Sequence, residues 1–216
     1  MTSTGPATTV LVPTSRLVRW LENFEHRHGA THLEVVDGGL SGQAADGSDF
    51  AARLPFDTTY GGVPEAGAFA AAAREPDSWG VLLVRKGGFA VARVEHGEVV
   101  GRKVGRRHVQ GRTKAGGQSQ QRFARRRDNQ ARQAFEAAAD HAVRILARSG
   151  NEPLSVVTGG DRAAVTEVLT DPQLSHVVVV PPWLPLPDPR ATELDRALAD
   201  ARALSVTVRN ADPLRA

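Results

Sequence analysis

The sequence has no cysteine among its 216 residues, which excludes disulfide bonds and thiolate metal sites and fits a cytoplasmic protein. It also lacks any run of about 18 apolar residues, the length that a membrane-spanning helix requires. The first nine residues lack the basic start and apolar core of a secretory signal peptide. With 41% hydrophobic and 24% charged residues, the composition is that of a globular domain, and we expect no membrane partner.

Several catalytic patterns are missing as well. Metal-dependent hydrolases need clustered carboxylates or histidines, and because no such cluster is evident we expect neither a metal nor a cofactor. No serine lies in a Gly-x-Ser-x-Gly elbow. The run Val157-Thr158-Gly159-Gly160-Asp161 has the glycines of a phosphate-binding turn but not the P-loop lysine or the dinucleotide spacing. We interpret it as a structural turn with Asp161 near a helix N-cap.

Hydrophobic periodicity predicts an α+β fold, in which a mixed β-sheet is flanked by helices. An antiparallel meander is predicted first, then a long helix with an apolar stripe through Ala138, Ala142 and Leu146, and then a βαβαβ unit with buried parallel strands. The predicted ranges are 79–84, 89–94 and 99–104 for the meander, 120–149 for the helix, and 154–157, 161–169, 177–180, 191–204 and 206–208 for the last part. We expect a single domain over 1–216, with a core at 78–208 and an N-terminal extension of a helix and a hairpin at 1–77.

Positive charge is concentrated in one short stretch. Residues 102–132 hold 11 of the 27 basic residues and only one of the 24 acidic residues, so the rest of the chain is net acidic. Such a basic segment on an acidic body is typical of a directed contact with nucleic acid. The alternatives are a solvated face or a contact with the acidic body itself, but a face selected only for solubility would more often mix the two signs.

Within this stretch, residues 111–127 predict a flexible tip that leads into a helix. Gly116 and Gly117 tolerate positive φ and allow a close approach to a partner. Ser119 is a suitable N-cap for the helix that follows. Between them lies Gln118, an uncharged side chain that both donates and accepts hydrogen bonds. This arrangement favours the placement of one small group against a polyanion.

The run Gly116-Gly117-Gln118-Ser119-x-x-Arg122-Phe123-Ala124-Arg125-x-Arg127 resembles, without a gap, the Gly-Gly-Gln loop and following helix of the middle domain of eukaryotic and archaeal class-1 peptide-chain release factors. Residues 79–101 are similar to that domain's strand–turn–strand lead-in, and residues 156–161 to its strand-to-helix turn. We find no counterpart of the codon-reading and partner-binding domains. The chain is more similar to the stand-alone release-factor-like group VLRF, and residues 110–113 resemble its actinobacterial branch.

This resemblance implies a peptidyl-tRNA hydrolase that acts on stalled large ribosomal subunits. Its partners would be peptidyl-tRNA and the ribosomal RNA of the peptidyl transferase centre, with no DNA. Gly116 and Gly117 would carry the active amide, which is Gln118 by direct register or Gln120 if an extra residue follows the glycines, as related patterns allow. The implied RNA-binding residues are Arg106, Arg107, Arg112, Lys114, Arg122, Arg125, Arg126 and Arg127.

Two other functions fit the same residues. The first is a non-catalytic ribosome- or RNA-binding module that uses the basic helix 119–132 without chemistry. The second is cleavage of the 3′ end of the tRNA in place of ester hydrolysis.

Overall fold

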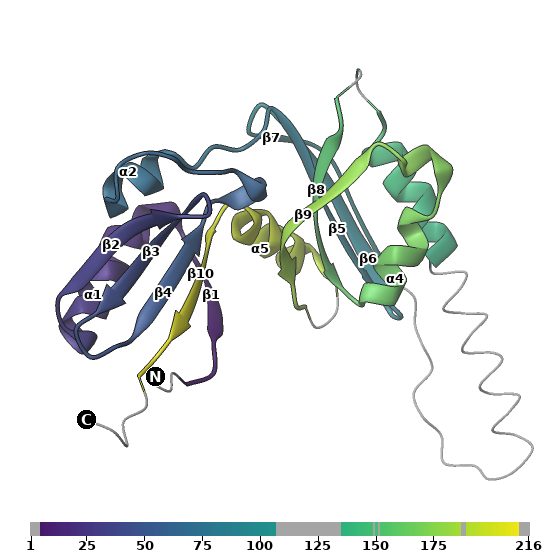
Figure 1. Ribbon diagram of the computed structural model, residues 1–216. Helices are drawn as coiled ribbons and strands as arrows, with labels where there is room; N and C mark the ends of the chain where they lie inside the picture. The colour runs from purple at the N-terminus through teal and green to yellow at the C-terminus, as the bar shows by residue number, and fades with distance from the viewer. Residues whose placement is uncertain (1–4, 107–134, 149, 151, 187–188, 212–216) are drawn as a thin grey trace, which may run out of the picture. The chain divides into compact units, whose positions relative to one another are not determined.

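The computed structural model describes residues 5–106, 135–148, 150, 152–186 and 189–211. The chain forms two compact units, unit 1 from Met1–Glu75 with Ala199–Ala216 and unit 2 from Pro76–Leu198. Each unit contains a five-stranded β-sheet packed against helices (Figure 1). The predicted α+β class is therefore confirmed. A single release-factor-like domain over 1–216 stays a prediction.

Unit 1 is an antiparallel sheet with the strand order β1-β10-β4-β3-β2. Its strands are β1 Thr8–Val12, β2 Thr31–Val36, β3 Gly39–Ala44, β4 Asp49–Arg53 and β10 Leu204–Arg209. The helices α1 Leu17–His28 and α2 Ala66–Ala71 cover one face, with short 3-10 turns η1 Thr14–Arg16 and η2 Pro55–Asp57. Phe24, Phe50 and Phe69 anchor the core between helices and sheet, where large aromatic rings supply most of the buried area.

The position of β10 differs from the prediction. The sequence predicts Val206–Val208 as the last parallel strand of the core sheet, but β10 lies in unit 1 and pairs antiparallel with β1 and β4. Its even positions, Leu204 and Val206, are buried, while its odd positions Ser205 and Thr207 are more exposed. This alternation is typical of an antiparallel strand with one covered face. The predicted βαβαβ unit is therefore a βαβ unit in the core sheet.

Unit 2 is a mixed sheet with the order β7-β6-β5-β8-β9. Its strands are β5 Ser78–Arg85, β6 Gly88–Glu95, β7 Glu98–Arg106, β8 Leu154–Gly160 and β9 Val177–Leu184. The first three form the predicted antiparallel meander. Strand β8 pairs parallel with β5. Strand β9 pairs parallel with β8, as predicted.

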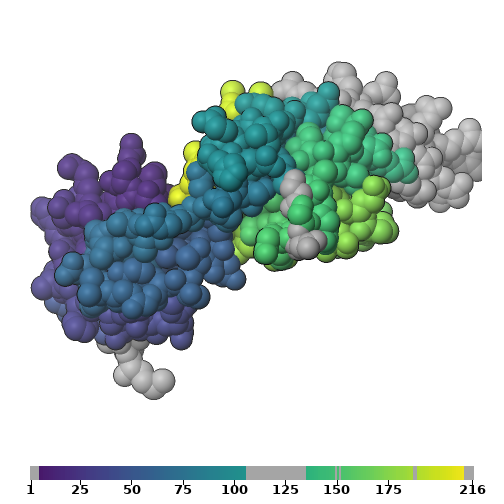
Figure 2. All heavy atoms as spheres, turned by 90° about the horizontal axis from the view of Figure 1, so that it is seen from above, coloured from purple at the N-terminus to yellow at the C-terminus, as the bar shows by residue number. Residues whose placement is uncertain are grey.

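Helices cover the sheet of unit 2. Residues 135–145 are helical, and the predicted start of that helix lies outside the described residues. This helical segment and α4 Arg162–Leu169 pack on one face of the sheet, followed by the 3-10 turn η3 Pro172–Leu174. Figure 2 shows the green atoms that follow residue 135 beside the teal atoms of the meander. The chain returns to unit 1 within α5 Ala191–Ala201.

Strand β9 departs from the prediction in two ways. It was predicted to be buried, but Val178 and Val179 are 47% and 51% exposed, because β9 is an edge strand. It was also predicted to stop at Val180, but it continues through Pro181 and Pro182 to Leu184. Proline lacks the N–H that a central strand donates, and an edge strand tolerates this loss.

Candidate functional site

The predicted catalytic and RNA-binding residues fall mainly in one stretch, residues 107–134, which we name the Gly-Gly-Gln segment. Of these predicted residues, Arg106 is described, as the last residue of β7. The others lie outside the described residues: Gly116, Gly117, Gln118, Gln120, Arg107, Arg112, Lys114, Arg122, Arg125, Arg126 and Arg127. The structure thus defines the two flanks that carry this segment. The catalytic and RNA-binding roles of the residues within the segment stay predictions.

The first flank is the end of β7. Arg106 pairs with Gly88 of β6, and Gly88 pairs with Arg85 of β5. Strands β5, β7, β8 and β9 run in the same direction, so their carboxyl ends lie at one edge of the sheet. We name this the carboxyl edge, and the chain enters the Gly-Gly-Gln segment from it.

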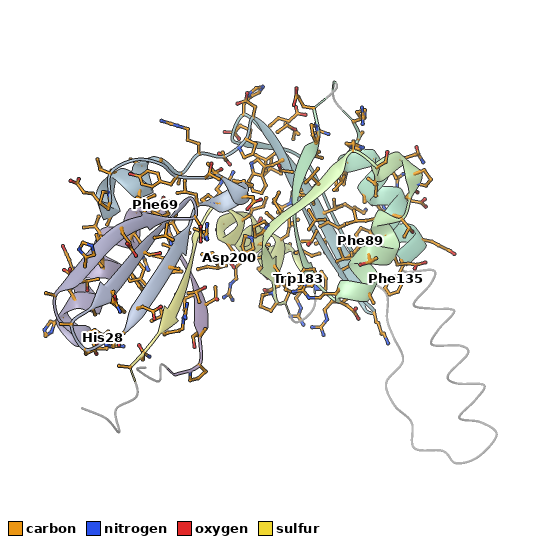
Figure 3. The ribbon with its side chains drawn as sticks, in the orientation of Figure 1. His28, Phe69, Phe89, Phe135, Trp183 and Asp200 are labelled. Atoms are coloured by element: carbon orange, nitrogen blue, oxygen red, sulfur yellow. The ribbon has the colours of Figure 1, made fainter. Side chains whose placement is uncertain are left out.

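The second flank is the helical segment 135–145, which runs along β6 and β7. A Cβ at Gly101 in the middle of β7 would lie 3.5 Å from Ile145. Nearer the carboxyl edge, His141 stacks on Phe89 with ring centroids 5.3 Å apart, and a Cβ at Gly105 would overlap that phenyl ring. Going back along the helix therefore leads toward the carboxyl edge. Figure 3 shows Phe135 at this end of unit 2, as well as Trp183. Both flanks thus lie at the same edge.

Small residues allow this helix to approach the sheet closely. Ala138, Ala142 and Leu146 recur every four residues and are fully buried, which confirms this part of the predicted apolar stripe. Gly80 of β5 makes room for Leu146, since a Cβ there would lie 2.6 Å from the leucine Cδ2. Close packing of this kind is sensitive to single methyl groups, so the axis of the helix is well fixed.

Two buried polar side chains hold the carboxyl end of this helix. The guanidinium of Arg93, on β6, donates to the carbonyl of Ala147 and to Ser78 Oγ, the latter at 3.0 Å. It also forms an ion pair with Glu95, with Nε 2.9 Å from Oε1. His176 Nε2 lies 2.8 Å from the carbonyl oxygen of Leu146. The last carbonyls of a helix have no partner within it, and cations there also interact favourably with its dipole.

The glycine turn after β8 belongs to the carboxyl edge. A Cβ at Gly159 would lie 2.3 Å from the carbonyl oxygen of Leu184, and one at Gly160 would lie 2.3 Å from that of Val84. Gly160 also has φ of +98°, which side chains disfavour. The Asp161 carboxylate accepts from Ala163 N at 3.0 Å and Ala164 N at 3.3 Å. The prediction of a structural turn with Asp161 as the N-cap is confirmed.

Further cations gather at the carboxyl edge. Arg85 passes beside Gly160 and donates to the carbonyl of Leu186 at 2.6 Å. The guanidinium carbon of Arg162 lies 4.2 Å from the centre of the Trp183 ring, a cation–π contact. Lys86, in the turn after β5, is exposed. The edge that carries the Gly-Gly-Gln segment is therefore itself basic.

Two other cations act on His141, which lies on the helical segment 135–145. Its burial lowers the pKa of the imidazole below the ordinary value, and the nearby charges of Arg144 and Lys103 lower it further. Asp140 acts in the opposite direction but is the weakest of these influences. The imidazole is therefore held neutral, because a third positive charge between Arg144 and Lys103 would be repelled.

In unit 1, three polar groups form a cluster with the residue types of a catalytic triad. His28 Nδ1 lies 2.8 Å from Asp46 Oδ2 and 3.0 Å from Ser48 Oγ. Both partners share one ring nitrogen, whereas a triad needs the serine and the acid on opposite nitrogens. Ser48 is fully buried and also accepts from the backbone N–H of Ala211. The cluster therefore ties α1 to the β3–β4 turn and to the end of β10.

The described part of the chain holds no group of three or more histidine or carboxylate side chains placed to bind a metal ion. None of its helices has the length and apolar character needed to cross a membrane.

The comparisons with known proteins agree with this arrangement. Residues 77–207 match the family described as Actinobacteria/chloroflexi VLRF1 release factor, acVLRF1. The chain belongs to this family. The matched region begins at the start of β5, spans the whole core sheet and the Gly-Gly-Gln segment, and ends within β10. A search of curated proteins gave no match. Membership in acVLRF1 supports a release-factor-like function in association with the ribosome, and the VLRF resemblance of the sequence is confirmed.

Sequence reasoning missed the residues that support the acVLRF1 flanks. Arg93 follows Phe89 and Val91 in the same alternation, and a cation in phase with buried apolar residues is a detectable signal of a paired interior charge. The contact of Arg162 with Trp183 joins two residues 21 positions apart in the chain. No local pattern reports such a contact.

Proposed function

We propose that this acVLRF1 protein is a peptidyl-tRNA hydrolase that frees nascent peptide from stalled large ribosomal subunits through the Gly-Gly-Gln segment. The observation that carries the proposal is the ungapped Gly116-Gly117-Gln118 motif with its Arg-Phe-Ala-Arg continuation in a chain of this release factor family. The sheet edge described above supports it, because both flanks of the segment lie there among cations. Such a protein works in the cytoplasm.

Hydrolysis of the ester between peptide and tRNA requires few groups from the protein. The ester between peptide and tRNA is already activated, and hydrolysis needs a water about 3–3.5 Å from the carbonyl carbon and donors for the developing oxyanion. The Gln118 side chain holds that water, or its backbone N–H donates to the transition state or to the leaving 3′-hydroxyl. Gly116 and Gly117 let the backbone approach the ester closely. No titrating base is required.

The cations supply position. The predicted RNA-binding residues of the Gly-Gly-Gln segment would contact phosphates of ribosomal RNA and of the tRNA acceptor end, and such contacts set register without reading sequence. The anchored helix 135–145 supports this role, because its buried stripe and its held carboxyl end give the segment a rigid base. Peptide release would then depend on the fixed direction in which the helix 135–145 presents the Gly-Gly-Gln segment to the ester.

The test uses purified large subunits that carry labelled peptidyl-tRNA, and it compares Gln118→Ala, Gln120→Ala, the double variant and Gln121→Ala. We expect loss of the active amide to slow peptide release about 10²- to 10³-fold, the usual effect of removing one transition-state donor. Gln121→Ala is the matched control, since it removes an amide one residue beyond the two candidates. If both single variants and the double variant release peptide at the wild-type rate, the hydrolase proposal fails.

Subunit-binding measurements and analysis of the released product separate the two rival functions. A binding module would lose subunit association on charge reversal at Arg125, Arg126 and Arg127 while tolerating the glutamine variants. Cleavage of the tRNA end would leave a nucleotide fragment on the released peptide, which gel analysis of the product detects. Ester hydrolysis leaves the tRNA intact.

A further inference from the structure

We propose that Arg162 and Trp183, together with Lys86, form a second RNA-contact surface on this protein, which we name the Arg162–Trp183 platform. The proposal rests on the proposed function for its partner, the RNA of the ribosome or the tRNA acceptor end. It adds a contact outside the Gly-Gly-Gln segment, on the rigid core of unit 2. Its ligand is a nucleotide of exposed RNA, bound through its base and its phosphate.

Position is the first argument. Strands β5 and β8 pair up to Val84 and Gly160, so the turn that contains Lys86 and the start of α4 follow neighbouring strands at the carboxyl edge. Trp183 is next to the last residue of β9, the adjacent strand on the other side. Figure 3 shows Trp183 at the same end of unit 2 as Phe135. RNA that engages the Gly-Gly-Gln segment is thus brought to this edge.

Rigidity is the second argument. Trp183 packs against the hydrophobic core of unit 2, so its ring is a fixed surface. Arg162 is the first residue of α4, whose start is capped by the Asp161 carboxylate. The guanidinium therefore lies on a ring that cannot easily move and extends from a helix end that cannot easily fray. A preorganised pair loses little conformational entropy on binding.

Available chemistry is the third argument. The contact with Trp183 uses one flat face of the guanidinium, and a stacked arginine keeps its five N–H donors for other partners. Arg162 is exposed, and among the described residues no carboxylate lies within ion-pair distance of it. Asp161 is its acidic neighbour, and the Oδ1 oxygen of that carboxylate accepts from two backbone N–H groups at the start of α4. The pair thus offers a planar stacking surface and donors suited to phosphate.

The choice of RNA follows from this combination. An acidic protein segment would require cations but would gain nothing from a planar arginine–tryptophan pair. Unstacked bases of RNA bind aromatic and guanidinium planes, and their phosphates bind the same cations. The basic stretch 102–132 begins on β7, whose carboxyl end lies at the same edge of the sheet. Lys86 adds a cation at the adjacent turn, while Arg85 is engaged with the connector after β9.

The experiment measures the affinity of the full chain for a fluorescent RNA hairpin with a single-stranded 3′ tail, over a series of KCl concentrations. Arg162→Gln removes one phosphate contact, so the slope of log K against log salt should become shallower by about 0.7. Trp183→Leu should weaken binding about tenfold with little change in slope, because stacking is lost and charge is kept. The matched control is Arg148→Gln, an exposed arginine just beyond Ala147, whose carbonyl is bound to Arg93 near the opposite edge.

Equal affinity and slope for Arg162→Gln and Arg148→Gln would overturn the platform. So would a loss that appears on intact large subunits but not on the protein-free RNA, because the surface would then contact a ribosomal protein. Circular dichroism checks folding, and if Trp183→Leu does not fold, the exposed Arg162→Gln carries the test alone. The binding assay contains no ester, so failure of the hydrolase proposal in the peptide-release assay is a separate result.

Discussion

Replacement of Arg93 by methionine tests whether the helix that leads out of the Gly-Gly-Gln segment is held from its far end. Arg93 is 6% exposed, and its guanidinium bonds the Ala147 carbonyl and Ser78 Oγ. Methionine has similar length but no donor. Both acceptors then stay in place without their partner, while Glu95, whose side chain is 38% exposed, can be hydrated.

The magnitude follows from these three contacts. A hydrogen bond from a charged donor contributes about 1.5–3 kcal/mol, and the one to the part-buried Ala147 carbonyl is the larger part. Loss of the ion pair adds less than about 1 kcal/mol, because Glu95 reaches solvent. We therefore expect Arg93→Met to lower the free energy of unfolding by about 2–3 kcal/mol. The free energy of unfolding of Arg93→Lys should lie between those of Arg93→Met and the wild type, since lysine keeps the charge but not the planar guanidinium group.

The assay is urea unfolding followed by tryptophan emission, since Trp79 and Trp183 both lie in unit 2, combined with hydrogen exchange on peptides covering 135–148. Exchange should rise most in the last turn of the helix, where the carbonyls lose their donor. The matched control is Arg144→Met, an exposed arginine on the same helix that bonds the carbonyl of Asp140 within it, for which we expect less than about 0.5 kcal/mol. An unfolding free energy for Arg93→Met within that margin of wild type would refute the reasoning.

Two other measurements test the core of unit 2. Asp161→Ala removes the N-cap of α4 and should cost about 1 kcal/mol in urea unfolding, whereas Asp171→Ala, which removes the single cap bond of η3 to Gln173 N, should cost less; equal losses would contradict the N-cap assignment. Because the pKa of His141 is lowered in the fold, the unfolded chain binds the proton first, so the stability from the neutral ring is complete above about pH 6.5 and is lost as the pH falls through the lower folded pKa. His141→Phe should therefore lose less stability than wild type between pH 7.5 and 5.5, and identical losses would show that folding does not lower the pKa of His141.

The sequence predicted what depends on local pattern. A continuous apolar run placed β5, alternation placed β6, and the turn signal at residues 95–98 placed β7. The glycine turn before Asp161 was correctly interpreted, and its two glycines lie against the carbonyls of Leu184 and Val84. Strand partners were less predictable. The run Leu204–Arg209 alternates apolar and polar residues, which distinguishes it from the continuous apolar run at the start of β9, but the pattern does not identify which sheet receives the strand.

For the candidate site, the motif and its positive charge could be predicted from the sequence. The described structure adds the contacts that anchor the helix following the Gly-Gly-Gln segment. Gln118 and its neighbours form a contiguous pattern, so they could be recognised from the chain alone. The contacts of Arg93 with Ala147 and of His176 with Leu146 join residues 54 and 30 positions apart. Which distant groups meet in a folded chain depends on topology, and no spacing rule reports it.

The position of β10 within the sheet of unit 1 has a consequence for folding during synthesis. Unit 2 is one uninterrupted stretch of chain, inserted between the two parts of unit 1. Strand β10 lies between β1 and β4, so β1 has no partner in its sheet until Arg209 has emerged from the exit tunnel. The N-terminal part of unit 1 is thus synthesised first, but its sheet is completed only after β10 has been synthesised. A nonsense mutation within the codons of β10 would therefore disrupt unit 1, although the other strands of its sheet all precede Glu75.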